Sequence, residues 1–197
     1  MQLNTVKNIV IILLISTALT AKAQYSIGSW KDHLPYNNAF AICHYNNDIY
    51  IATENGLFTK ELSDNSIRKL NKTNGLSDVG ITAVENNERH LIIGYINGNI
   101  DVIEKRDMYN IPLLKNKAII GEKKINNINI YEETAYLSCS FGVLEVSLPK
   151  KEISNTYWLN ASQDLAVNEL AFFENQLFAA TDSGLYFANK NDNLVDF

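Results

Sequence analysis

The segment Asn46–Phe58 reads NNDIYIATENGLF, and its pattern recurs three more times along the chain. The later copies are ERHLIIGYINGNI (Glu88–Ile100), ETAYLSCSFGVL (Glu133–Leu144) and NQLFAATDSGLY (Asn175–Tyr186). Each copy has a glycine near its end, and these glycines follow one another at intervals of 42, 44 and 42 residues: Gly56, Gly98, Gly142 and Gly184. Four residues before each glycine stands a small residue: Ala52, Gly94, Ser138 or Ala180. The sequence is therefore built from a repeat of about 42 residues.

Each repeat has the pattern of four short strands separated by polar turns. In the first repeat we expect strands over 39–45, 48–53, 57–62 and 66–70. The segments between them contain Asn, Asp and Gly, which adopt positive φ at low cost and fix the register of hairpins. The expected strands are rich in Ile, Tyr and Phe, as β-strands are. Four antiparallel strands in about 42 residues predict an all-β fold, a β-propeller of four-stranded blades. A sandwich or a β-solenoid is the alternative, but neither requires a constant period.

About four blades fit the length of the chain. The last repeat predicts strands over 166–173, 176–181, 185–190 and 193–197, and only 163–173 has a weak helical period as an alternative. Propellers have about four to eight blades and close by pairing the first blade with the last. We therefore expect an incomplete, truncated ring, and a domain over 24–197 that is the N-terminal propeller of a longer protein.

The first 23 residues have the features of a secretory signal peptide. A short N-terminal region with Lys7 precedes the apolar run Ile9–Ile15, and Ala21-Lys22-Ala23 then supplies small residues before Gln24. A membrane anchor is the alternative, but this apolar run is too short to span the hydrocarbon core of about 30 Å. We therefore expect a signal peptide over 1–23, export to the periplasm or the outer face of the outer membrane, and no transmembrane segment after cleavage.

Composition limits the classes of partner. Hydrophobic residues make up 46% and charged residues 20% of the chain, which excludes a disordered chain. There are 17 basic and 22 acidic residues, giving a net charge of -5. A net negative chain without a long basic patch is a poor partner for nucleic acid or anionic lipid.

The sequence offers no convergent set of catalytic or metal-binding residues. None of the three histidines has a second His or Cys at the spacing of metal ligands: His33, His44 and His90. Cys43 and Cys139 fall in the first and third repeats, so we expect two separate thiols that serve packing. The remaining carboxylates are scattered, and we expect them in solvated turns: Asp48, Glu54, Asp64, Asp78, Asp101 and Asp182. We expect the aromatic side chains to form inter-blade core: Tyr50, Phe58, Phe178 and Tyr186. The expectation is a non-enzyme without cofactor or metal.

Several longer motifs resemble the PorZ family, an accessory component of the type IX secretion system of Bacteroidota. They are Trp30–Asn38 (WKDHLPYNN), Gly75–Asp78 (GLSD) leading into Ile81, Tyr95–Asp101 (YINGNID), Gly121–Ile128 (GEKKINNI) and Glu152–Tyr157 (EISNTY). The resemblance covers essentially the whole chain after the signal peptide.

The resemblance implies a role at the cell surface. Members of this family belong to the attachment complex, which removes the C-terminal sorting signal of secreted cargo and joins the cargo to anionic lipopolysaccharide. It implies the other attachment-complex proteins as partners. Family members have two propellers and a small C-terminal β domain that is implicated in lipopolysaccharide recognition, and about four blades alone are not expected to bind lipopolysaccharide. The GLSD pattern is also similar to the periplasmic sensor propellers of two-component regulators, so a ligand-sensing propeller is the alternative function. An enzyme ranks third, because a site at the centre of the ring would need paired carboxylates.

The first testable prediction concerns the mature N-terminus. We expect the exported protein to begin at Gln24, because Ala21 and Ala23 place small side chains at the positions that signal peptidase requires. N-terminal sequencing of the protein from the periplasmic and surface fractions checks this. A protein that still begins at Met1 in those fractions would contradict it.

Overall fold

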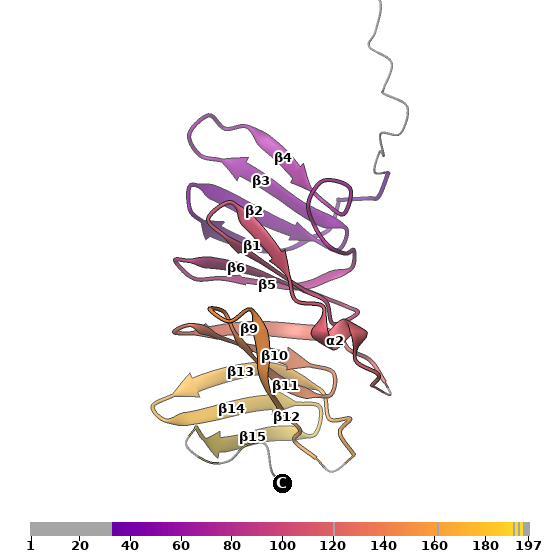
Figure 1. Ribbon diagram of the computed structural model, residues 1–197, viewed down its shortest axis with the longest axis vertical. Helices are drawn as coiled ribbons and strands as arrows, with labels where there is room; N and C mark the ends of the chain where they lie inside the picture. The colour runs from indigo at the N-terminus through magenta and orange to yellow at the C-terminus, as the bar shows by residue number, and fades with distance from the viewer. Residues whose placement is uncertain (1–32, 120, 161, 191, 193, 195–197) are drawn as a thin grey trace, which may run out of the picture. The chain divides into compact units, whose positions relative to one another are not determined.

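The computed structural model describes residues 33–119, 121–160, 162–190, 192 and 194 (Figure 1). The expected signal peptide 1–23, the cleavage site before Gln24 and the first three residues of the motif at 30–38 lie outside the described residues. So does the expected final strand 193–197, apart from Leu194.

The described residues form four antiparallel sheets, each made from consecutive strands. The first sheet contains β1 (Ala39–Tyr45), β2 (Asp48–Thr53), β3 (Gly56–Glu61) and β4 (Ile67–Leu70), and the second contains β5 (Ile81–Asn86), β6 (His90–Tyr95), β7 (Ile100–Glu104) and β8 (Asp107–Asn110). The third contains β9 (Ile125–Tyr131), β10 (Thr134–Cys139), β11 (Gly142–Ser147) and β12 (Glu152–Tyr157), and the fourth contains β13 (Val167–Phe173), β14 (Gln176–Thr181) and β15 (Gly184–Asn189). A single helical turn, α2 (Leu113–Asn116), precedes β9.

This architecture confirms the prediction of propeller blades. The strands of the first sheet begin and end within one residue of the predicted bounds. The weak helical alternative over 163–173 is wrong, because Val167–Phe173 pairs with β14 along its length. The turn α2 was not predicted; its only buried side chain is that of Leu114.

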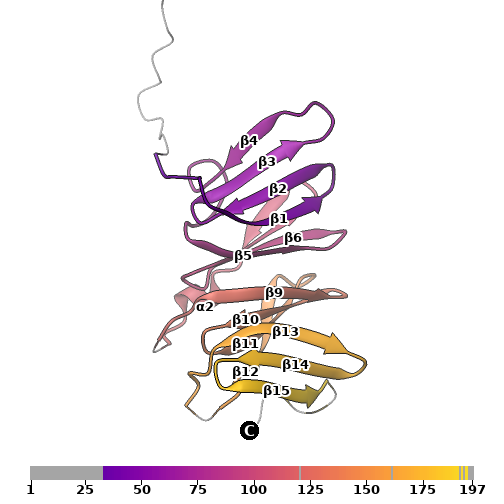
Figure 2. The same ribbon diagram turned by 180° about the vertical axis from the view of Figure 1, so that it is seen from behind.

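Neighbouring blades contact one another through their first strands. β1 contacts β5, β5 contacts β9, and β9 contacts β13, as can be followed in Figure 2. Among the described residues, no strand of the first sheet pairs with a strand of the fourth. The blades therefore form an incomplete propeller without a closed ring, as the repeat count predicts.

The repeat glycines all lie between the second and third strands of their blades, in two different settings. Gly56, Gly142 and Gly184 are the first residues of their strands and pair with Thr53, Cys139 and Thr181. Gly98 lies instead inside a longer turn, because β6 ends at Tyr95 and β7 begins only at Ile100. A Cβ on Gly56 would lie 2.7 Å from the carbonyl oxygen of Leu70, so the close approach of the fourth strand explains this glycine.

The residue after the turn glycine shows how burial depends on the next blade. Leu57 is 0% exposed and Val143 is 2% exposed, whereas Leu185 is 67% exposed. The three residues hold the same position in their hairpins. Leu57 and Val143 belong to the apolar clusters that form where one sheet packs against the next. Leu185 lies on the fourth sheet, beyond which no further sheet is described.

The expectation of an inter-blade aromatic core holds for Tyr50, holds in part for Tyr186, and needs correction for Phe58 and Phe178. Tyr50 packs in the cluster between the first and second sheets. Phe58 pairs with Ile51, on the opposite face of the first sheet from Tyr50. Phe178 pairs with Phe187, which is 67% exposed, on the outer face of the fourth sheet. Tyr186, one residue from Phe187 along the strand, faces the third sheet and is 40% exposed. The alternation of side chains along a strand separates these neighbours.

The small residue of the second repeat permits close packing of the second and third blades. A Cβ on Gly94 would lie 2.7 Å from Cγ2 of Ile125, the first residue of β9. Ile125 is fully buried within the apolar cluster of these two sheets. Space, rather than backbone conformation, therefore requires glycine here.

We expect Gly94→Ala to lower the free energy of unfolding by about 1–3 kcal/mol, because the added methyl group overlaps Ile125. Urea unfolding of the full-length protein measures the loss. In a double-mutant cycle with Ile125→Ala, which removes the overlapping carbon, the two losses should not add. Strictly additive losses would show that the two side chains do not compete for this space.

Candidate functional site

A buried carboxylate joins three segments where the first and second blades meet. Asp78 lies in the connection from β4 to β5, and its side chain is only 7% exposed. Lys72 of the same connection donates to it at 3.0 Å, and Lys115 of α2 donates at 2.6 Å. The side-chain amide of Asn97, in the turn after β6, donates at 2.7 Å. The blade connection, α2 and the β6–β7 turn are thus held by one side chain.

A second buried carboxylate, Asp101 of β7, extends this network. Its side chain is fully buried and accepts hydrogen bonds from the backbone N–H of Ser77 at 2.8 Å and the hydroxyl of Tyr95 at 2.6 Å. The amide of Asn110 donates to its other oxygen at 2.9 Å. We call the following residues the Asp78–Asp101 cluster: Lys72, Ser77, Asp78, Tyr95, Asn97, Asn99, Asp101, Asn110 and Lys115.

The electrostatics of the cluster favour the ionised form of Asp78. Burial alone would raise the pKa of its carboxyl, but hydrogen bonds from Lys115, Asn97 and Lys72 outweigh that penalty. The pKa of Asp78 is therefore held well below its usual range. Burial and the neighbouring charge of Asp101 raise the pKa of Tyr95, so its hydroxyl remains a proton donor.

The cluster corrects the expectation that the scattered carboxylates occupy solvated turns. That expectation describes Asp64, which is exposed and accepts a hydrogen bond from the backbone N–H of Ser66 at 2.8 Å. It is wrong for Asp78 and Asp101, which are buried. A sequence signal for Asp101 existed, because it lies between Ile100 and Val102 within a strand of apolar residues. A charged residue in such a strand requires buried partners.

The histidines and cysteines do not assemble into a reactive site. His33 and His44 are exposed, and His90 is buried with its Nδ1 unpaired among the described residues. Both thiols are free, which confirms the prediction of separate cysteines. Burial raises the pKa of Cys43 to about 11, so this thiol is a weak nucleophile at neutral pH. Over the described ranges, no group of three or more His, Cys, Asp or Glu side chains is placed to hold a metal ion.

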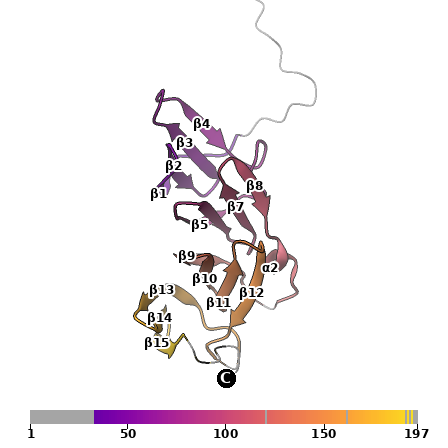
Figure 3. The ribbon, with the colours of Figure 1, turned by 60° about the vertical axis from the view of Figure 1, so that its left-hand side comes forward.

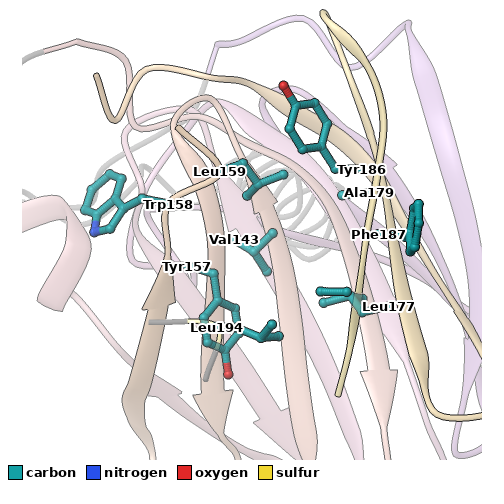
Figure 4. A pocket seen from close by; sticks show the side chains of 10 residues that line it. Val143, Tyr157, Trp158, Leu159, Leu177, Ala179, Tyr186, Phe187 and Leu194 are labelled. Atoms are coloured by element: carbon teal, nitrogen blue, oxygen red, sulfur yellow. The ribbon is translucent and has the colours of Figure 1, made fainter. Parts of the chain in front are cut away.

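A cavity of about 320 Å³ lies between the third and fourth sheets (Figure 4). Val143, Tyr157 and Leu159 line one side, and Leu177, Ala179 and Tyr186 line the other. The described lining has no charged side chain, and the hydroxyl of Tyr157 already donates to Glu145. Such a lining suits packing rather than acid–base chemistry.

In the part of the chain that the structure describes, no helix is long and apolar enough to cross a membrane.

The Asp78–Asp101 cluster gives a pH-dependent prediction. A carboxyl whose pKa is depressed in the folded state stabilises the fold above its unfolded pKa of about 3.9, and this contribution is lost as the pH falls toward the folded pKa. We expect Asp78→Asn to cost about 1–3 kcal/mol at pH 7, because charge-assisted hydrogen bonds are lost. Its free energy of unfolding should also fall less steeply than that of the wild type below about pH 5.

Urea unfolding of the full-length protein between about pH 3 and pH 7 measures both effects. Asp182→Asn is the matched control, because Asp182 is exposed and its substitution should change stability by less than about 0.5 kcal/mol. Equal pH profiles for wild type and Asp78→Asn would contradict the depressed pKa.

Several solved structures have a similar fold. A PorZ structure from Porphyromonas gingivalis, described as an essential bacterial surface component of the type IX secretion system, superposes with a TM-score of 0.75 and 23% sequence identity, covering 86% of this chain. The extracellular domain of a hybrid two-component system from B. thetaiotaomicron gives a TM-score of 0.63 and 18% identity, covering 77% of this chain and 20% of that one. The computationally designed protein Ika8 gives a TM-score of 0.56 and 13% sequence identity, and the match covers 77% of this chain and 45% of the Ika8 chain.

This chain spans 23% of the PorZ structure that it matches. No curated protein matches it. The family model described as the PorZ N-terminal β-propeller domain of the type IX secretion system matches residues 49–197, which covers all four sheets apart from β1 and the first residue of β2. The chain belongs to the PorZ N-terminal β-propeller family.

Proposed function

We propose that this chain is a non-catalytic scaffold of the type IX secretion attachment complex, exported to the cell surface. The observation that carries the proposal is the match of the PorZ N-terminal propeller model to 49–197. The Asp78–Asp101 cluster supports it, because the buried carboxylates are engaged in joining blades and are not free for chemistry. Attachment-complex proteins are the proposed partners.

The proposal places the protein outside the cytoplasmic membrane. The similar structures include a bacterial surface component and an extracellular domain. An uncleaved cytoplasmic protein would have no access to cargo that has crossed the outer membrane. The signal peptide expected over 1–23 provides the route of export.

A sensory role is the second candidate. The observation that favours it is the superposition on the extracellular domain of a two-component system. A sensor of that type signals through a membrane helix to a kinase. It would therefore change transcription when its ligand is present and would leave the processing of secreted cargo unchanged.

Deleting the gene in its natural host tests the proposal. We expect cargo proteins to keep their C-terminal sorting signal and to be lost from the cell surface, because the attachment complex lacks a component. Immunoblots of cargo in periplasmic, surface and medium fractions measure this, and the wild-type gene supplied in trans should restore processing. A periplasmic protein exported by another route is the control for general envelope damage.

The two candidates differ in the outcome of this deletion. Normal processing and surface attachment of cargo would contradict the scaffold role. Normal processing combined with altered expression of a defined set of genes would instead support the sensor.

A further inference from the structure

A groove of about 690 Å³ lies between the first and second blades, on the side of their outer strands. Figure 3 shows these strands, β4 and β8, labelled on the same side of the ribbon. Tyr50, Thr59 and Arg68 form one wall, as a row of paired residues across β2, β3 and β4. Lys105 and Arg106, in the turn between β7 and β8, lie on the other wall.

Two hydroxyl groups that line this groove have no hydrogen-bond partner among the described residues. Tyr50 is 9% exposed and Thr59 is 4% exposed, and both line the groove. Within the described part of the chain, neither hydroxyl takes part in a hydrogen bond. Because neither hydroxyl is engaged within the protein, both donors are available to a group bound in the groove that accepts hydrogen bonds.

The charged side chains that line the groove carry a net positive charge, because four are basic (Arg68, Lys69, Lys105 and Arg106) and two are acidic (Asp48 and Glu61). Arg68 contacts both carboxylates, at 3.5 and 3.9 Å. Lys105 and Arg106 are exposed and form no ion pair with any described residue. This local excess of cations contrasts with the net charge of -5 of the whole chain.

The acidic residues that flank this turn do not cancel its charge within the groove. Glu104 pairs with Asp107 across the hairpin, so the two share a face. Glu104 lies 4.0 Å from Lys151 of the third blade, which places that face on the side away from the groove. Side chains alternate between the faces of a strand, and Ile103 accordingly packs toward the first blade.

The cationic turn is held in place by the first blade. The backbone N–H of Lys105 donates to the hydroxyl of Tyr45 at 2.7 Å, and the amide of Asn46 donates to the carbonyl oxygen of Lys105 at 3.3 Å. The Tyr45 hydroxyl itself donates to the carbonyl oxygen of Arg89 at 2.6 Å. A preorganised turn loses little conformational entropy when a ligand binds.

We propose that this groove binds an extended, acidic peptide segment of a partner protein. The hydroxyl and cationic groups provide donors for a carboxylate, for which charge-assisted hydrogen bonds are strong. Leu70, Ile103 and Met108 provide apolar contacts for a neighbouring aliphatic side chain. An acidic polysaccharide has the carboxylates but lacks such side chains, so the apolar contacts favour a peptide.

This inference deepens the proposed scaffold role by naming the chemistry of its partner. Its test measures binding to the purified full-length protein and requires no secretion assay. Loss of binding and loss of secretion are therefore separate results, and either proposal can fail while the other stands.

The probe is a fluorescein-labelled peptide, Gly-Glu-Leu-Glu-Val-Asp-Ser-Gly, and the readout is fluorescence anisotropy. We expect saturable binding that weakens as salt is added. A peptide with Gln and Asn in place of Glu and Asp should bind about tenfold more weakly, because it loses the charge-assisted contacts.

Two sets of variants locate the site. Lys105→Gln combined with Arg106→Gln should weaken binding about tenfold, and Tyr50→Phe combined with Thr59→Val should weaken it several-fold. Lys150→Gln is the matched control, because Lys150 lies before the outer strand of the third blade and outside the groove. Equal melting temperatures of the Gln variants and the wild type show that folding is intact.

Three results would overturn the proposal. The first is the absence of saturable peptide binding. The second is binding that the Lys105 and Arg106 substitutions leave unchanged. The third is binding of polygalacturonate, but not of the peptide, in a manner that depends on Lys105 and Arg106, which would assign the groove to acidic glycans.

Discussion

The packing of one sheet against the next is the constraint on which the rest of this fold depends. A four-stranded sheet has two faces, and both contain apolar side chains in the middle blades. Leu57, Val143 and Leu185 occupy one position in three repeats, yet only the first two are buried. The difference arises from the neighbouring sheet and not from the side chain, as expected when repeats are stabilised mainly by their nearest neighbours. The contact of Gly94 with Ile125 shows how closely two blades approach when one residue lacks a Cβ.

Apolar packing alone does not set how the first two blades are joined. The hydrophobic effect has no direction, so aliphatic contacts fix the relative position of two sheets only through the fit of their side chains. Asp78 and Asp101 add directional contacts: Ser77 in the blade connection donates to Asp101 in β7, and Lys115 in α2 donates to Asp78. Because both carboxylates are buried, a different position of the blade connection or of α2 would leave one of them unpaired in the interior, which is costly. The cluster therefore favours one arrangement of the blade connection, α2 and the second blade.

The sequence predicted the strands well because their signals are local. A period of about 42 residues, turns of Asn and Gly, and alternating apolar residues identify blades without reference to contacts. The faces of the strands were harder to predict, and Phe178 and Tyr186 were grouped although they point to opposite sides of the fourth sheet. The burial of Asp78 and Asp101 was missed for a related reason. Their partners, Asn97, Lys115 and Asn110, come from segments that meet only after two blades have packed, and no local pattern encodes that meeting.

Some polar groups between the first two blades are engaged within the fold, and others are left without a partner. Tyr45 and Tyr95 lie between the first two blades, and both hydroxyls have partners. The Tyr45 hydroxyl bonds to the backbone of Lys105 and Arg89. The Tyr95 hydroxyl donates to Asp101. Tyr50 and Thr59 lie on the same interface but toward the outer strands, where the blades diverge and a groove opens. Folding therefore satisfies the polar groups near the centre of the interface and leaves those at its outer edge unpaired. For the proposed scaffold role such a place suits the binding of a partner, because the blade interface provides rigid walls while the groove provides access. The hydroxyls of Tyr50 and Thr59 have no partner among the described residues and line the groove, so a bound carboxylate gains these two donors together with the cations of the β7–β8 turn.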